Sequence, residues 1–330
     1  MSTYPKITNT SVLVTGGAGF IGSNLIEDLL KYNNRVVCLD NFSTGKQANI
    51  YPFLKHPHFK LITGDIRNLE DCHKAVEGNE IVLQQAALGS VPRSLKDPLT
   101  TNEVNVTGFL NMLIASRDAG VKRFVYAASS STYGDSQTLP KVEEQIGKPL
   151  SPYAVTKYVN ELYAHVFGLN YNMQIIGLRY FNVFGKNQDP DGAYAAAIPK
   201  FIKLLMQHQS PTINGNGTNS RDFTYIQNVI QMNHLAALTQ SSDAIGQVFN
   251  TAVGERSDLN GLLILLKRFL SEFDPAIANI QVLYGPERAG DIPHSLASIQ
   301  KAQGLLGYQP SHTLEKGLHE SVKWYWDHLR

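Results

Sequence analysis

Short apolar stretches alternate with segments of helical periodicity through the first half of the chain. Ile21, Leu25 and Leu29, for example, recur at the spacing of one helix face. The apolar stretches cover residues 12–14, 36–39, 61–62, 81–83, 124–127 and 175–178. Such alternation is typical of a parallel sheet with helices on both faces. The pattern therefore predicts an α/β fold with a doubly wound parallel sheet.

The second half is less regular and predicts a smaller α/β region. We expect the helix that carries Tyr153 to run to about residue 171, and later helices near 197–207, 226–240, 259–273 and 314–328. A turn is expected at residues 214–217, where Asn and Gly alternate. We divide the chain into domains 1–183 and 184–330. This boundary is soft, because later strands can return to the first sheet.

Composition excludes several classes of protein. The chain has 330 residues, 43% of them hydrophobic, and a net charge of +1 without a basic block, which argues against a nucleic-acid-binding surface. Cys38 and Cys72 are too few for a disulfide framework, and the scattered histidines predict no metal site. We see no signal segment and no apolar run of the ~20 residues that a membrane span requires. A cytoplasmic location is the resulting expectation.

A glycine motif follows the first predicted strand. Gly16, Gly19 and Gly22 are spaced Gly-x-x-Gly-x-x-Gly, with Phe20 and Ile21 at the start of the next helix. Glycines allow a tight turn that comes close to a pyrophosphate, and the helix start offers free N–H groups. The strand–turn–helix context favours a dinucleotide site.

Two acidic residues follow the next two strands. Asp40 ends the second strand, where a carboxylate accepts hydrogen bonds from ribose hydroxyls and repels a 2′-phosphate, so NAD is favoured over NADP. The alternative is that Asp40 caps a turn with Asn41. Asp65 follows the third strand and is a candidate contact to adenine, or else a helix cap before Leu69.

Tyr153 and Lys157 are four residues apart and share one helix face. A tyrosine that acts as a base near neutral pH needs its pKa lowered by ~3 units, which corresponds to ~4 kcal/mol. A positive charge at ~4 Å supplies about that much at an effective dielectric constant of ~20. The spacing therefore indicates a tyrosine base with a lysine that favours its phenolate.

Taken together, these motifs resemble the extended short-chain dehydrogenase/reductases, and among them the UDP-N-acetylglucosamine 4-epimerases. The resemblance covers nearly the whole chain and implies a Rossmann-type fold with a carboxyl-terminal substrate domain, bound NAD and a UDP-sugar substrate. Besides the residues above, it implies these cofactor contacts: Asn41, Gly45, Ile66, Ala86, Asn105 and Tyr180. Gln84 and Gln85 depart from the family, where many members carry a histidine.

The resemblance also assigns the catalytic serine and the sugar end of the site. Ser129 precedes the Tyr133-Gly134 pair at the family spacing and would hydrogen-bond the 4′-oxygen of the sugar. Ser130 and Ser131 stand where related 4,6-dehydratases place Asp-Glu, which argues against dehydration. Without the resemblance, the serine run would be a polar strand end.

Further positions match the family's substrate contacts. Asn182, Arg221 and Arg288 would bind the diphosphate, and Asp291 the uridine ribose. Without the resemblance, Arg288 and Asp291 would be an ordinary exposed pair. The other expected substrate contacts are Gly89, Ser90, Ala196, Asn214 and Ser295. Ser295 replaces a bulky tyrosine of epimerases restricted to UDP-glucose and UDP-galactose, so room for an N-acetyl group is expected. Alternatively, Ser295 caps a helix that starts near Ala297.

The expected reaction is C4 epimerisation of UDP-N-acetylhexosamines, and UDP-glucose with UDP-galactose is a second possible pair. Rival interpretations are another nucleotide-sugar enzyme (a 4,6-dehydratase, a decarboxylase or a reductase) or a non-catalytic NAD-binding protein. Members of this fold that have become non-catalytic NAD-binding proteins usually lose the Tyr or the Lys, and this chain keeps both. The resemblance further implies a homodimer joined through the helices near 99–119 and 151–171, and a role in polysaccharide biosynthesis.

Overall fold

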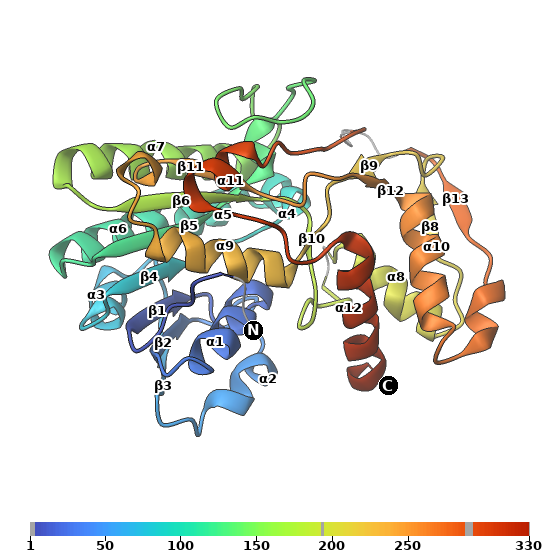
Figure 1. The fold of residues 1–330 in the computed structure, drawn as a ribbon, viewed down its shortest axis with the longest axis horizontal. Helices are drawn as coiled ribbons and strands as arrows, with labels where there is room; N and C mark the ends of the chain where they lie inside the picture. The colour runs from blue at the N-terminus through green and yellow to red at the C-terminus, as the bar shows by residue number, and fades with distance from the viewer. Residues whose placement is uncertain (1–3, 193–194, 288–292, 330) are drawn as a thin grey trace.

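A seven-stranded parallel sheet forms the centre of the computed structural model, which describes residues 4–192, 195–287 and 293–329 (Figure 1). The strand order is β11-β6-β5-β4-β1-β2-β3. The strands are β1 (Ser11–Thr15), β2 (Arg35–Asp40), β3 (Phe59–Thr63), β4 (Ile81–Gln84), β5 (Arg123–Ser129), β6 (Ile175–Tyr180) and β11 (Val248–Thr251). The order reverses between β1 and β4, and in such sheets ligands bind at this point, beyond the carboxyl ends of the strands.

Helices cover both faces of the sheet, as the alternating pattern predicts. One face packs against α1 (Phe20–Leu30) and α9 (Ile226–Leu238), and the other against α3 (Leu69–Val76), α6 (Gly108–Asp118) and α7 (Pro152–Tyr171). The inner strands β2, β4 and β6 are buried on both faces, which explains why they read as continuous apolar runs. The prediction of a doubly wound α/β fold is confirmed.

A second, smaller region lies beside the carboxyl edge of the sheet (Figure 1). Its helices α8 (Ala197–Met206), α10 (Leu259–Leu270) and α12 (Leu314–His328) pack on one another. Three two-stranded pairs join it: β7 (Val183–Phe184) with β10 (Thr224–Tyr225), β8 (Thr212–Asn214) with β13 (Leu283–Gly285), and β9 (Ser220–Arg221) with β12 (Ser257–Asp258). The four helices expected in this half are present; each starts at the expected residue and ends within three residues of the expected end.

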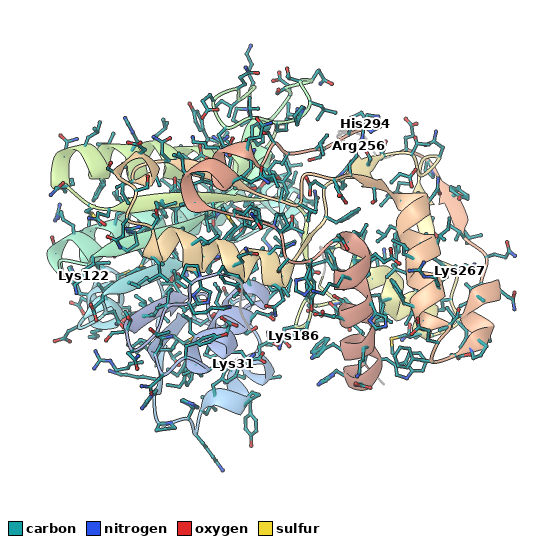
Figure 2. All side chains as sticks on the ribbon, in the orientation of Figure 1. Lys31, Lys122, Lys186, Arg256, Lys267 and His294 are labelled. Atoms are coloured by element: carbon teal, nitrogen blue, oxygen red, sulfur yellow. The ribbon has the colours of Figure 1, made fainter. Side chains whose placement is uncertain are left out.

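The chain crosses between the two regions more than once. After residue 183, both α9 and β11 return to the first sheet, and β11 pairs with β6 from Val248↔Gly177 to Thr251↔Tyr180. Lys186, between the two regions in Figure 2, forms an ion pair with Glu27 of α1. A single cut at residue 183 therefore does not separate the sheet from everything that packs on it.

The remaining short elements lie mainly in connections. They are α2 (Gln47–Ile50), α4 (Val91–Lys96), α5 (Pro98–Asn102), the single π-type turn η2 (Glu103–Thr107), α11 (Gln300–Leu306), and the 3₁₀ turns η1 (Tyr51–Phe53), η3 (Ser130–Tyr133), η4 (Ser242–Ala244) and η5 (Pro275–Asn279). The expected helix start near Ala297 is wrong, because α11 begins at Gln300 and the segment before it runs extended beside β9. Within the described residues, no helix is long and apolar enough to cross a membrane.

Candidate active site

The glycine turn between β1 and α1 is tightly closed on itself. The N–H of Gly16 donates to the carbonyl of Leu39 at 2.8 Å, and the N–H of Gly19 donates to the carbonyl of Gly16 at 3.1 Å. Gly16 has φ +64°, and a Cβ on Gly22 would lie 2.2 Å from the Gly16 oxygen, so both positions require glycine. Gly19 begins α1 without a side-chain cap, which leaves the first helical N–H groups available to an anion.

Asp40 connects this turn to the end of β2. Its carboxylate accepts the N–H of Ala18 at 2.8 Å and the N–H of Phe42 at 2.8 Å. The turn-capping role that we gave as the alternative is therefore present. Because each carboxylate oxygen accepts more than one hydrogen bond, these contacts leave positions for ribose hydroxyls as well.

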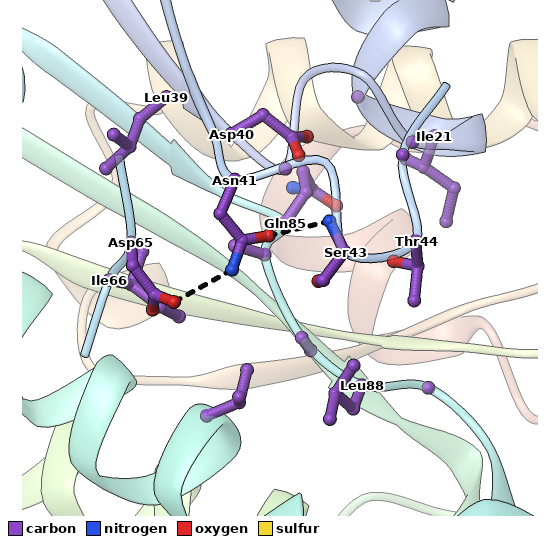
Figure 3. A pocket seen from close by; sticks show the side chains of 18 of the residues that line it. Ile21, Leu39, Asp40, Asn41, Ser43, Thr44, Asp65, Ile66, Gln85 and Leu88 are labelled. Carbon is purple, nitrogen blue, oxygen red and sulfur yellow. Dashed lines mark hydrogen bonds between the residues drawn. The ribbon is translucent and has the colours of Figure 1, made fainter. Parts of the chain in front are cut away.

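Asp65 lies across the same cavity from Asp40, as Figure 3 shows. It accepts the Asn41 amide at 2.8 Å and pairs with Arg67 at 2.7 Å. The hydrogen bond from Arg67 lowers the pKa of Asp65 to about 2, so its carboxylate stays ionised. The alternative that Asp65 caps the following helix is wrong, because Asn68 supplies the cap of α3.

These groups enclose a cavity of about 280 Å³ at the carboxyl edge of β1, β2, β3 and β4. Predicted cofactor residues that line it are Gly16, Gly19, Phe20, Ile21, Gly22, Asp40, Asn41, Gly45, Asp65, Ile66 and Ala86, together with the predicted substrate residue Gly89. Asn105 lies behind the wall. Its amide bonds both backbone groups of Leu88 and the hydroxyl of Thr156, so it holds the wall to α7.

The candidate catalytic residues come from α7 and from the end of β5. Ser151 caps α7 by accepting the N–H of Ala154 at 3.1 Å, which places Tyr153 in the first turn and Lys157 one turn later. Lys157 is buried, and its ammonium group donates to the carbonyl of Ala127 at 2.7 Å. Ser129 ends β5 and caps η3, where its hydroxyl accepts from the N–H and the hydroxyl of Ser131.

The protonation of this group differs from our expectation. Burial raises the pKa of Tyr153, and a hydrogen bond with the Ser129 hydroxyl only partly opposes that effect. Burial likewise lowers the pKa of Lys157 to about 8, against the attraction of Glu161. The expected lowering of the tyrosine pKa by Lys157 is absent, because desolvation dominates and the ammonium group faces a backbone carbonyl.

An ion pair that sequence reasoning missed supports the catalytic turn. Arg179 donates from two nitrogens to the two carboxylate oxygens of Glu161 at 2.9 and 2.7 Å, and both side chains are buried. Glu161 also accepts the hydroxyl of Thr132, and Arg179 lies 4.8 Å from the ring centre of Tyr133. Glu161 follows Lys157 by one helical turn, and that spacing was the available signal.

A second cavity of about 350 Å³ lies in the smaller region. Four predicted substrate residues from separate segments line it: Asn182, Ala196, Asn214 and Arg221. Asn182 has φ +36° and donates its amide to the carbonyl of Asp222 at 3.0 Å, which connects the end of β6 to the segment after β9. The structure therefore brings together residues that are up to 39 positions apart in sequence.

The remaining substrate candidates lie in three different settings. Ser90 caps α4 by accepting the N–H of Arg93 at 3.2 Å, while Ser130 and Ser131 belong to η3. The N–H of Ser295 donates to the carbonyl of Ser220 at 2.9 Å, so Ser295 lies beside Arg221 and not at a helix start. Arg288 and Asp291 lie outside the described residues.

Within the described residues, no group of three or more His, Cys, Asp or Glu side chains is arranged to hold a metal ion. The residues of the first cavity do fit a dinucleotide. A pyrophosphate requires close backbone approach and free N–H groups, and these are supplied by the turn at Gly16 and Gly22, which has no space for side chains, and by the uncapped start of α1. A ribose requires a carboxylate beyond the next strand, and Asp40 supplies it.

Comparisons with known proteins agree with this geometry. The profile described as "NAD dependent epimerase/dehydratase family" matches residues 12–252. A solved UDP-N-acetylglucosamine 4-epimerase from Methanobrevibacter ruminantium M1, in complex with UDP-N-acetylmuramic acid, is 36% identical with a TM-score of 0.90, covering 97% of this chain and 99% of that one.

Two further solved structures are similar over nearly their whole length. UDP-glucose 4-epimerase from Thermotoga maritima, with UDP-glucose, is 31% identical with a TM-score of 0.88, covering 97% and 100% of the two chains. UDP-glucuronic acid 4-epimerase from Bacillus cereus, with UDP-glucuronic acid and NAD, is 31% identical with a TM-score of 0.86, covering 96% and 99%. The chain belongs to the NAD-dependent epimerase/dehydratase family, and its cofactor is NAD.

Proposed function

We propose that the protein interconverts UDP-N-acetylglucosamine and UDP-N-acetylgalactosamine by inverting C4 of the sugar, with UDP-glucose and UDP-galactose as a second substrate pair. The observation that carries this proposal is the position of Ser295. This small side chain lies beside β9, next to Arg221 of the second cavity. A serine at this place leaves volume for the N-acetyl group at C2 that a tyrosine would occupy.

Tyr153 is the proposed base that takes the proton of the 4′-hydroxyl. Bound NAD⁺ supplies the hydride acceptor, the later hydride donor and a positive charge near the phenol. Because burial alone raises the pKa of Tyr153, we infer that the phenolate forms only when this charge acts together with Lys157. Ser129, whose hydroxyl opposes the rise in the pKa of Tyr153, would hold the same sugar oxygen and pass the proton.

The second cavity is the proposed site of the UDP group. Arg221 and Asn182 would hold the diphosphate, since a guanidinium group suits phosphate oxygens. Ala196 and Asn214 would lie nearer the uridine. The side chains proposed for the sugar end, Ser130, Ser131 and Ser295, are small and neutral. The 4-keto sugar could therefore rotate about its link to an anchored UDP group and receive the hydride on the opposite face.

The direct test is to incubate the protein with UDP-N-acetylglucosamine, with and without added NAD⁺, and to follow UDP-N-acetylgalactosamine by proton NMR. We expect the product without net oxidation or reduction. Parallel samples contain UDP-glucose and UDP-glucuronic acid, the ligands of similar solved structures. Epimerisation of only those two would show that the substrate is wrong, and a net redox product would show that the reaction is wrong.

Ser295→Tyr tests the size argument separately. We expect this variant to lose most turnover of the acetylated pair, because the phenol occupies the volume for the N-acetyl group, and to retain turnover of UDP-glucose. Unchanged turnover of both pairs would contradict the assignment of Ser295.

We also propose that the protein is a homodimer joined through α7 and the α5–α6 segment. Val155, Leu162, Val166 and Leu169 form an exposed apolar stripe along α7, and Leu169 is 72% exposed. Their spacing of 7, 4 and 3 residues is that of a helix packed against another helix. Leu162→Glu with Leu169→Glu should give monomers by sedimentation, whereas Leu283→Glu on β13 should not.

The division into a cofactor part and a substrate part also remains a proposal. We propose that residues 1–183 bind NAD and residues 184–330 bind the UDP-sugar, with α9 and β11 belonging structurally to the cofactor part. We further propose a role in polysaccharide biosynthesis, since acetylated UDP-hexoses are precursors of such polymers.

A further inference from the structure

We propose that Asn233, a buried side chain of α9, is a positioning residue for the NAD site. It acts through Tyr180 and Gln85, with which it forms a closed triangle of hydrogen bonds, and Gln85 belongs to the lining of the cavity. Asn233 itself does not line the cavity. Its role would be to fix Gln85, the member of the triangle that lines the cavity, both directly and through Tyr180.

The triangle joins three elements that are distant in sequence. The Asn233 amide donates to the Tyr180 hydroxyl at 2.9 Å, and that hydroxyl donates to the Gln85 carbonyl oxygen at 3.1 Å. The Gln85 amide nitrogen closes the ring by donating to the Asn233 carbonyl oxygen at 3.3 Å. Each side chain is therefore both a donor and an acceptor, and the orientation of one determines the other two.

Hydrogen-bond capacity shows what the triangle leaves available. Asn233 uses its second N–H on the carbonyl of Val229 in its own helix, at 2.8 Å. Burial raises the pKa of Tyr180 to about 12, so its hydroxyl remains a donor at neutral pH. Gln85 carries two N–H groups, and the triangle uses one of them. The other is a donor whose direction the triangle sets.

Because of the position of Gln85, we expect its remaining N–H group to donate a hydrogen bond to the bound dinucleotide. Gln85 lines the cavity directly after β4, and its labelled side chain lies among the lining residues in Figure 3. Its backbone N–H donates to the hydroxyl of Thr15 at 3.1 Å, which holds it against the glycine turn after β1. The neighbouring strand β5 ends in Ser129, so Gln85 lies between the phosphate turn and the catalytic residues.

The triangle also lies on the sheet face opposite to the candidate base. Tyr180 packs with α1 and α9, whereas α7, which carries Tyr153 and Lys157, packs on the other face. A bound dinucleotide that passes over the strand ends would therefore have the triangle on one side and the base on the other. Removing Asn233 would free Tyr180 and Gln85 to rotate without disturbing α7.

The test compares Asn233→Leu with Gln231→Leu in the full-length protein. Gln231 is a buried amide two residues away on α9, and it donates to the carbonyl of Gln309 at 2.9 Å, outside the NAD site. Isothermal titration with NAD⁺, after removal of any bound nucleotide, gives the affinity, and thermal unfolding gives the stability. We expect Asn233→Leu to weaken NAD⁺ binding about tenfold, and Gln231→Leu to lose stability without a change in NAD⁺ affinity.

A double-mutant cycle separates positioning from general damage. If the triangle acts as a unit, Tyr180→Phe should weaken NAD⁺ binding to a similar extent, and Tyr180→Phe combined with Asn233→Leu should be no weaker than either single variant. Unchanged NAD⁺ affinity in Asn233→Leu would overturn the proposal. Equal loss in Gln231→Leu, or fully additive losses in the cycle, would also overturn it, since either result would indicate a structural effect only.

Discussion

The two cavities of this protein are built in different ways. The dinucleotide cavity is lined by residues between 16 and 104, and all of them except Val104 of η2 lie at the end of a strand of one sheet or in the stretch directly after it. The second cavity is lined by residues between 182 and 259 that come from α8, β8, β9 and the chain after β6. The first depends on the close backbone approach at Gly16 and Gly22, whereas the second depends on the packing of separate elements.

This difference indicates how each site responds to change. Parallel strands bring their carboxyl ends to one edge, so the dinucleotide cavity follows from the sheet itself. Gly16 and Gly22 of its turn have almost no freedom, because a Cβ at either position would collide with backbone. The second cavity is lined by residues of separate elements, so a substitution there need not distort a backbone turn.

The largest expected effect is at Tyr153, the proposed base, which lines neither cavity. Tyr153→Phe removes only the hydroxyl, and we expect kcat to fall by about 10³-fold, the usual contribution of general acid–base catalysis. NAD⁺ binding and the KM for the UDP-sugar should change little, since neither cavity is altered. Steady-state kinetics measure this, and near-normal turnover would remove Tyr153 as the base.

The next effect tests whether backbone shapes the dinucleotide cavity. Gly22→Ala places a Cβ 2.2 Å from the Gly16 oxygen, so the turn must open. We expect NAD⁺ affinity, measured by isothermal titration, to fall by about 100-fold, because ~3 kcal/mol of backbone strain corresponds to a loss of that size.

Gly304→Ala is the matched control for this change. Its Cβ would meet nothing within 4 Å, in the helix α11. This variant should gain about 0.5–1 kcal/mol in free energy of unfolding and bind NAD⁺ normally. Normal NAD⁺ binding by Gly22→Ala would show that the turn tolerates a side chain.

A smaller effect is expected from removing one side chain of the second cavity. Arg221→Ala should raise the KM for the UDP-sugar about tenfold, because a hydrogen bond to a charged group is worth about 1.5–3 kcal/mol. NAD⁺ affinity should stay the same. Arg256→Ala is the control. It removes an equal charge from the same edge of the molecule (Figure 2), but Arg256 does not line the cavity. Equal effects would mean that only net charge matters.

The smallest effect compares the two buried native thiols with a thiol placed in the second cavity. Cys38 and Cys72 are both buried, and burial raises the pKa of each to about 12, so each thiol is protonated at pH 8. Neither should react with Ellman's reagent in the native protein, with or without NAD⁺, and both should react after unfolding. Fast native reaction would show that the region around the first cavity opens.

A thiol placed in the second cavity should behave differently. Ala196→Cys puts a thiol at an exposed lining position before α8, where it should react readily at pH 8. UDP should slow this reaction if the cavity holds the nucleotide. An equal rate with and without UDP would contradict the assignment of the second cavity.

The sequence by itself determined the sheet, its helices and the phosphate turn. Their signals are local: apolar runs, helical spacing, and glycines between a strand and a helix. The four-residue spacing also placed Tyr153 and Lys157 on successive turns of one helix, α7. Such features depend on neighbouring residues, so a chain read in order reveals them.

Only the tertiary structure decided the environment of these residues. Burial reversed the expected pKa shift of Tyr153. The side-chain amide of Asn105 forms a hydrogen bond with the backbone of Leu88, and Asn233 forms one with Gln85, which is 148 residues away in the sequence. Desolvation and hydrogen-bond partners depend on which elements pack together, and no local spacing encodes that packing. The order of residues thus specified the chemical groups, while the fold decided their protonation and their partners.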